Sequence, residues 1–279
     1  MIEPYQYCLN FLQKNDYDHY ISVLLAPKNK RKDLAALYAF NLELFRITHT
    51  LKEPLISEIR LRWWHDTIEK GQTGSPLVTA LLKSIKRHSL PVEVFLHICE
   101  TKILSLYDHT ILNYKDLENY YYNTESLTIQ LACQILESKE ISACIKPSLH
   151  AGVAQGLKNL IRYLPIGIQQ RKQIILQAIL QEEKEKYRMH TQTTEIPYSQ
   201  VTSMIFALTS KHYKSFIEAI ETTQNLRRGA FLPIAIIPFY LNTIKKIGKK
   251  IFEPTLKLSH LHRQFLLIRS AWTGKFPSY

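Results

Sequence analysis

Apolar residues recur about every 3.6 positions along most of the chain, which is the period of an amphipathic helix. Residues 31–50 read RKDLAALYAFNLELFRITHT, with Leu34, Leu37, Tyr38 and Phe45 at helical spacing. Asp33 or a nearby residue can cap this helix. Nearly every other segment also has this period, rather than the period of two that indicates a β-strand. The pattern therefore predicts an all-α protein.

Prolines and glycines stand where helices are expected to begin and end. Pro54 and Gly71 bracket one predicted helix, and Ser75 with Pro76 begins the next. Proline is favoured in the first turn, serine as an N-cap and glycine just past the last turn. Pro91 is expected to open another helix. Further helices are predicted over about 114–137, 142–163, 168–187, 197–221, 228–248 and 256–273.

No Gly/Ser/Pro-rich linker, internal repeat or low-complexity tract divides the chain. Only eight of the 279 residues are glycine, whereas folds with many tight turns use more. We therefore expect one domain over residues 1–279. The apolar run at 230–241 (AFLPIAIIPFYL) is shorter than the roughly 18–20 residues that span a membrane. It is expected to form a buried core helix, with a patch resting against a membrane as the alternative.

The cysteines are widely spaced, without a CxxC pair or a cluster at zinc spacing, which predicts buried free thiols in a reducing compartment. The N-terminal residues MIEPYQYCLN lack the character of a signal or transit peptide. Together these features predict a location in the bacterial cytoplasm. This prediction includes peripheral contact with the inner membrane. The thiols belong to Cys8, Cys99, Cys133 and Cys144.

The formal net charge is +12, and a single acid, Glu253, follows Arg227. Such an excess favours an acidic partner: an anionic membrane surface, a phosphorylated ligand or a nucleic acid. Nucleic acid is the weakest of these, because no recognised binding motif accompanies the charge. A solvated helix face is the simpler explanation.

Short motifs add little chemistry. Asp16, Asp18 and His19 stand close together in NDYDHY, but without a metal-binding spacing we expect a hydrated turn or a helix cap. Arg60 and Trp64 are i,i+4 neighbours that allow a guanidinium to pack on an indole, although a core contact is the more common outcome. No GxSxG, P-loop or GxGxxG motif is present, so nothing supports a hydrolase, kinase or dinucleotide-binding function.

Several stretches, taken in order, resemble the squalene/phytoene synthase family and touch most of residues 15–175. That resemblance implies an isoprenoid-synthase-like helical bundle with a central cavity. The matching stretches are Tyr20 with LLAP after it, RKDLAALYAF (31–40), EIRLRWW (58–64), SPLVTAL (75–81), DLENYYYNTESL (116–127) and AGVAQGLKNLIRYLP (151–165).

Enzymes of this family resemble one another in two Asp-x-x-x-Asp motifs on facing helices. Carboxylates at i and i+4 share a helix face, so they can hold Mg²⁺, which in turn binds a diphosphate leaving group. Here the four aspartate positions hold Phe45, His49, Tyr163 and Gly167. A phenyl ring cannot bind Mg²⁺, and a neutral histidine is a poor ligand for so hard a cation. The resemblance therefore implies no metal, no other cofactor and no catalytic residue.

The finer match is to a subgroup of the family that lacks the aspartates and contains a mitochondrial complex I assembly factor and alphaproteobacterial relatives. It implies that the partner is a subunit or assembly intermediate of respiratory complex I. The residues singled out as lining a cavity or binding an anion are Arg31, Tyr38, Asn41, Arg60, Trp64, Asn123, Thr124, Gln155 and Arg162.

Two alternatives stay open at this point. The first is an active head-to-head prenyl diphosphate synthase that holds diphosphate with arginines, a scheme that would still call for Mg²⁺, since arginines rarely replace it in promoting ionisation. The second is an isoprenoid or lipid binder that keeps an apolar tunnel, with Phe45 and Tyr163 facing inward.

Overall fold

The computed structural model describes residues 3–51, 53–107, 111, 113–136, 141–163, 198–223, 228–247 and 259–278, and these contain helices and no β-strand. The helices are α1 (Pro4–Asn15), α2 (Tyr17–Leu25), α3 (Arg31–Thr50), α4 (Pro54–Glu69), α5 (Pro76–His88), α6 (Val92–Leu104), α7 (Tyr114–Tyr121), the π-helix η1 (Tyr122–Ser126), α8 (Leu127–Leu136), α9 (Ile141–Tyr163), α11 (Tyr198–Thr222), the 3₁₀-helix η2 (Arg228–Ile236), α12 (Ile237–Ile247) and α13 (His260–Thr273).

The predicted helix starts are confirmed where proline and serine mark them. Pro54 opens α4, and the Ser75 hydroxyl accepts a hydrogen bond from the Val78 amide at the start of α5. Gly71, just past α4, has a φ of +63°, a left-handed conformation that glycine adopts without strain.

Of the residues expected to cap α3, the nearby Lys30 occupies the N-cap position without a side-chain hydrogen bond, and Asp33 does not cap the helix. The helix begins two residues earlier, at Arg31, and Asp33 lies buried in its first turn. There the carboxylate accepts hydrogen bonds from Ser84, Arg87 and His88 of α5 at 2.8–3.1 Å. A buried carboxylate must be paired to be tolerated, and this one fastens α5 to the start of α3.

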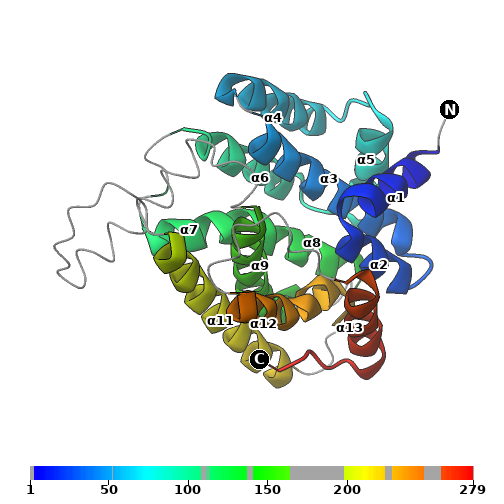
Figure 1. Ribbon diagram of the computed structural model, residues 1–279. Coiled ribbons are helices and arrows are strands. Elements are labelled where there is room, and N and C mark those ends of the chain that lie inside the picture. The colour runs from blue at the N-terminus through cyan, green and yellow to red at the C-terminus, as the bar shows by residue number, and fades with distance from the viewer. Residues whose placement is uncertain are drawn as a thin grey trace.

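Helix α3 runs through the middle of the main core, with every residue from 33 to 42 buried. Figure 1 shows α9 in the middle of the molecule, with α3 and α6 side by side above it, α4 at the top, and α11, α12 and α13 below. A second group of buried residues joins α7, α9 and α11, and a third joins η2 to α13. This arrangement makes the inner faces of α3 and α9 the centre of the fold.

Two predicted helices are not regular α-helices throughout. The helix expected over 114–137 contains the π-helix η1, and the one expected over 228–248 begins as the 3₁₀-helix η2. Pro233 inside η2 has no amide proton to donate, which weakens a regular α-helix there. The apolar run that includes it is buried, as expected. Helix α13 begins at His260 rather than near 256, and the helix predicted over 168–187 lies outside the described residues.

All four cysteines are free and buried, which confirms the prediction from their spacing. In the part of the chain that the structure describes, no helix combines the length and the hydrophobicity needed to cross a bilayer.

Candidate functional site

Helix α3 presents two different faces to the rest of the protein. Tyr38, Asn41, Phe45 and His49 recur at intervals of three or four and share one face. Glu43, Arg46, Ile47 and Thr50 share the other and line a groove. At 100° per residue the two sets of side chains point roughly 150° apart, so they face different parts of the protein. Glu43 therefore cannot replace a missing carboxylate at position 45, and this agrees with the helical spacing in the sequence.

Stacked rings lie at the two positions that the family resemblance assigns to the first metal-binding pair. The rings of Phe45 and His49 lie 3.9 Å apart between centroids, with 16° between their planes. The Nδ1 atom of His49 lies 2.9 Å from the Phe45 carbonyl oxygen, which can only accept a proton. One ring nitrogen is thus used as a donor, and the phenyl ring has no ligand atom. These residues do not fit Mg²⁺, which prefers oxygen ligands.

The second pair of metal-binding positions adds no carboxylate, because residues 163 and 167 are tyrosine and glycine. The side chains of Arg162 and Tyr163, and the whole of Gly167, lie outside the described residues. Elsewhere in the described part, His65, Asp66 and Glu69 on α4 bring possible ligand atoms within 4.8 Å of one another. That group lies on α4 rather than on α3 or α9.

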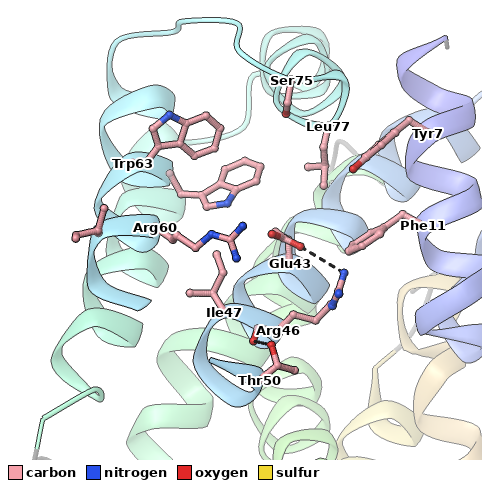
Figure 2. Close-up of a pocket in the computed structure, with 12 residues that line it drawn as sticks. Tyr7, Phe11, Glu43, Arg46, Ile47, Thr50, Arg60, Trp63, Ser75 and Leu77 are labelled. Atoms are coloured by element: carbon pink, nitrogen blue, oxygen red, sulfur yellow. Dashed lines mark hydrogen bonds and ion pairs between the residues drawn. The ribbon is translucent and has the colours of Figure 1, made fainter. Parts of the chain in front are cut away.

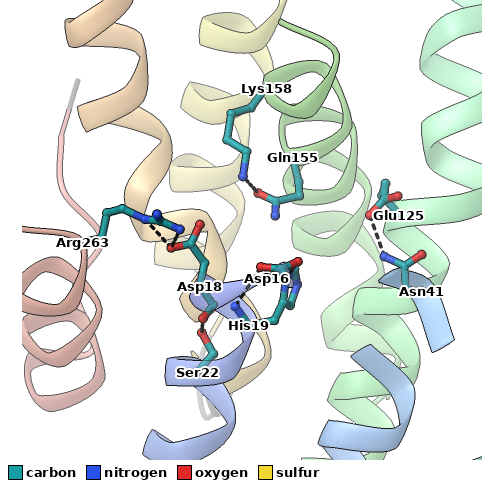
Figure 3. Close-up of polar contacts among 9 residues, drawn as sticks. All are labelled: Asp16, Asp18, His19, Ser22, Asn41, Glu125, Gln155, Lys158 and Arg263. Atoms are coloured by element: carbon teal, nitrogen blue, oxygen red, sulfur yellow. Dashed lines mark hydrogen bonds and ion pairs between the residues drawn. The ribbon is translucent and has the colours of Figure 1, made fainter. Parts of the chain in front are cut away.

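Beside the stacked rings lies a set of polar side chains, which we call the interior polar cluster (Figure 3). Asn41 donates to the Glu125 carboxylate over 3.0 Å, Lys158 donates to Gln155 over 3.1 Å, and Asp16 pairs with His19 at 2.7 Å. The cluster has two acids and two basic groups, contributed by α3, η1, α9 and the start of α2. Its members are Asp16, His19, Asn41, Glu125, Gln155 and Lys158.

The Asp16–His19 pair is shaped by opposing effects. Burial alone would raise the pKa of Asp16, but the adjacent His19 and then Lys158 lower it overall. Burial would lower the pKa of His19, but Asp16 outweighs it and the pKa is raised. Asp16 also caps α2 by accepting from the His19 amide, as predicted. The prediction of a hydrated turn is wrong for Asp18, which is buried and paired with Arg263.

Because the pKa of His19 is raised on folding, its contribution to stability is complete below about pH 6.5 and is lost as the pH rises through the folded value. Because the pKa of Asp16 is lowered on folding, the contribution of Asp16 to stability is lost only when the solution becomes strongly acidic. We expect His19→Gln to lower the free energy of unfolding by on the order of 2 kcal/mol at pH 6. The deficit should shrink with rising pH in urea titrations.

The matched control is His97→Gln, because the exposed His97 ring forms its hydrogen bond with the neutral side-chain amide of Asn123, at 3.2 Å, rather than with a carboxylate. The difference in free energy of unfolding between His97→Gln and the unaltered chain should change little between pH 6 and pH 9. A His19→Gln deficit that stays constant from pH 6 to pH 9 would contradict the ion pair.

Two atoms beside the cluster are buried without a hydrogen-bond partner among the described residues, the Tyr38 hydroxyl and the Asn41 Oδ1. Tyr38 is 3% exposed, and its ring lies 4.5 Å from that of His19. An unpaired buried polar atom is unfavourable, so both atoms could accept a partner from a bound molecule. Tyr38, Asn41 and Gln155 are thus residues that the sequence identified and the structure brings together.

The other predicted residues lie elsewhere. Arg31 donates to the Ala26 carbonyl at the start of α3, whereas Arg60 faces the second half of that helix, so they do not form one anion site. Asn123 contacts His97 in an exposed position, and the buried Thr124 hydroxyl donates back to Tyr120.

A groove of about 580 Å³ opens on the opposite face of α3, between α1, α4 and α5. Figure 2 shows the Arg60 side chain reaching into it toward Glu43, with Trp63 on one wall and Tyr7 and Phe11 on the other. Arg46 lies over the Phe11 ring at 5.3 Å. Trp64 packs edge-on against Phe40, which confirms the core contact expected for it. This groove is distinct from the central cavity implied by the family resemblance, which stays a prediction.

Sequence reasoning missed Glu125 and Lys158. Both are charged residues that normally lie at the surface, and only their neighbours in space reveal that they are buried. The π-helix turns Glu125 toward Asn41. The local sequence NTES (123–126) contains no pattern that predicts this π-helix. Single π-helical turns do often mark functional sites.

Comparisons with known proteins agree with this geometry. The family model for squalene/phytoene synthase matches residues 12–263. The chain is 29% identical to human NADH dehydrogenase (ubiquinone) complex I, assembly factor 6, over 95% of this chain and 81% of the relative. It is 27% identical to the Bos taurus protein of the same name, over 97% and 83%.

Solved structures share the fold. A dehydrosqualene synthase bound to a ligand superposes with a TM-score of 0.72 at 18% identity, covering 97% of this chain and 96% of that one. The squalene synthase from Alicyclobacillus acidocaldarius gives 0.61 at 16% identity, covering 88% and 94%. With a family match over most of its length and the fold of these synthases, the chain belongs to the squalene/phytoene synthase family.

Proposed function

We propose that this protein helps to assemble respiratory NADH dehydrogenase, and that it does so without prenyl transfer chemistry. The observation that carries the proposal is the stacked Phe45–His49 pair at the positions expected to bind the first metal, in a chain that the family model matches over residues 12–263. Tyrosine and glycine at the second position point the same way. The near full-length similarity to proteins named complex I assembly factors supplies the role.

Deleting the gene in its own cell should test the assembly role. We expect native gels of the membranes to lose the fully assembled NADH dehydrogenase while smaller subcomplexes accumulate. Expression of the intact chain should restore the full complex. Normal amounts of assembled enzyme in the deletion strain would contradict the proposal.

The absence of prenyl transfer has a separate test. Incubated with farnesyl diphosphate and Mg²⁺, the protein should form no C30 product, because no carboxylate pair holds the metal that promotes loss of diphosphate. An active dehydrosqualene synthase serves as the positive control. The variant Phe45→Asp/His49→Asp should stay inactive, since it restores only one of the two metal-binding pairs. Detection of a C30 product from the unaltered chain would favour the synthase alternative.

Binding of a ligand whose polar group reaches the interior polar cluster is a second candidate function, and it is favoured by the unpaired Tyr38 hydroxyl and Asn41 Oδ1. A lipid or isoprenoid with a polar head would fit this proposal. Native mass spectrometry of protein purified from its own cell should then detect a bound molecule that the Asn41→Leu variant loses.

We further propose that the protein works at the inner face of the membrane that holds NADH dehydrogenase. The supporting features are the basic C-terminal region and the anionic lipids of such membranes, which attract lysine and arginine.

A further inference from the structure

Helix α13 carries a row of large apolar side chains that face away from the protein. Their exposed fractions are 76% for Leu261, 61% for Phe265, 39% for Ile268 and 87% for Trp272. The spacing of four, three and four residues places them on one face of the helix. We call this row the α13 stripe. Scattered exposed apolar residues are ordinary, but four in line on one helix form a patch that needs an explanation.

The opposite face of α13 is firmly packed. Leu266 and Leu267 are buried there, and the Arg263 guanidinium pairs with Asp18 of α2. Counted at 100° per residue, the buried face and the stripe are about 180° apart. The helix is therefore fixed in orientation, and the stripe is an outer surface rather than a displaced core face.

The C-terminal residues turn away from the stripe. After α13 ends at Thr273, the ring of Phe276 packs edge-on against Phe216, 5.0 Å between centroids. The Pro277 carbonyl accepts a hydrogen bond of 2.6 Å from Tyr213. Figure 1 shows α13 at the edge of the molecule beside α2. The tail thus packs onto the protein and leaves the stripe exposed.

The charged residues of the C-terminal segment that contains the stripe all have one sign. From Pro254 to the end of the chain there is no aspartate or glutamate. Arg269, which is exposed, lies about 80° around the helix from Leu261, and the exposed Lys275 follows the helix end. An apolar row with aromatic rings and a basic flank is the pattern of a helix that lies in a membrane interface.

We propose that the α13 stripe inserts into the surface of an anionic lipid bilayer, with Arg269 and Lys275 contacting lipid phosphates. The helix of 14 residues would lie in the plane of the membrane over about 21 Å. Leu261, Phe265 and Ile268 enter the acyl region, and Trp272 sits at the level of the head groups, where its amphipathic ring is favoured.

A second copy of the chain is a poorer occupant. In a two-fold symmetric contact the same surfaces face each other, so the basic flank of one stripe would meet that of the other. No acid in residues 254–279 could compensate these charges. An anionic bilayer compensates them directly.

The inference deepens the membrane location in the proposed function, and it is tested without NADH dehydrogenase. The purified full chain is sedimented with vesicles of phosphatidylglycerol and phosphatidylcholine, and with phosphatidylcholine alone. We expect binding to the anionic vesicles only, weakened by salt. Phe265→Ser/Trp272→Ser should lower the partition coefficient at least tenfold, and Arg269→Gln/Lys275→Gln should lower it several-fold and reduce its dependence on salt.

The matched control is Leu104→Ser/Ile145→Ser, two exposed side chains, at 64% and 45%, that lie on different helices, α6 and α9. It should bind vesicles like the unaltered chain. Circular dichroism and gel filtration of every variant verify its fold and oligomeric state.

Three outcomes would overturn the inference. They are no binding to anionic vesicles, equal loss of binding in the Leu104→Ser/Ile145→Ser control, and vesicle binding unchanged in the stripe variant. In the last case, a dimer that the stripe variant dissociates would assign the stripe to a contact between copies. If the stripe variant loses the vesicle binding of the unaltered chain but the deletion strain assembles NADH dehydrogenase normally, only the assembly role is refuted. The two failures are therefore distinguishable.

Discussion

Replacing Arg263 with alanine should lower the free energy of unfolding by about 3–5 kcal/mol. Its guanidinium Nε lies 2.7 Å from the Asp18 carboxylate, and the two side chains are 7% and 2% exposed. Removing the cation leaves a buried carboxylate without its partner, which is far less favourable than losing an exposed ion pair. Because Asp18 belongs to α2 and Arg263 to α13, the loss should also loosen α13. Urea denaturation followed by circular dichroism measures the change.

Two further variants separate a buried ion pair from a general packing effect. Asp18→Ala/Arg263→Ala should be more stable than Arg263→Ala alone, because it removes the uncompensated charge. Arg62→Ala, which breaks an exposed pair with Glu58, should change stability by less than about 1 kcal/mol. Equal losses for Arg62→Ala and Arg263→Ala would show that burial of the pair is unimportant.

Replacing Gly152 with alanine should destabilise the protein by about 3 kcal/mol, although alanine is the better helix former. A Cβ atom at position 152 would lie 2.3 Å from the backbone nitrogen of Ser126. Backbone cannot move aside as a flexible side chain can, so α9 would have to separate from η1. That separation would also pull Glu125 away from Gln155 and Lys158.

Gly74→Ala is the matched control, because its Cβ would meet the Trp63 ring at 3.4 Å, an ordinary contact. Its denaturation midpoint should stay close to that of the unaltered chain. Gly156→Ala should resemble Gly152→Ala, since its Cβ would lie 2.1 Å from the Tyr121 ring. A Gly152→Ala protein as stable as the control would contradict the close approach of α9 and η1.

Helix starts were predictable because their causes are local. Pro54, Ser75 and Pro76 act through the backbone of their own first turn, so a few neighbouring residues contain the whole signal. Asp33 was misassigned for the complementary reason. Its partners Ser84, Arg87 and His88 follow it by more than fifty residues, and no local pattern contains them.

The loss of the metal-binding carboxylates was likewise visible in the sequence, since it depends on residue identity at known positions. The interactions that the replacing residues make were not visible in the sequence. The stacking of Phe45 on His49 depends on side-chain rotamers, and the pairing of Asn41 with Glu125 depends on a π-helix 84 residues away.

The amino-acid sequence by itself determined that the protein is helical, that it belongs to this family and that residues other than aspartate stand at the four positions of the family's metal-binding motifs, because periodicity, helix caps and residue identity are properties of short segments. Only the tertiary structure decided which charges are buried and which apolar faces are left exposed. Asp18, Lys158 and the α13 stripe all occupy amphipathic helices of similar pattern. Whether a face meets another helix or the solvent depends on how distant helices pack, which no single segment specifies.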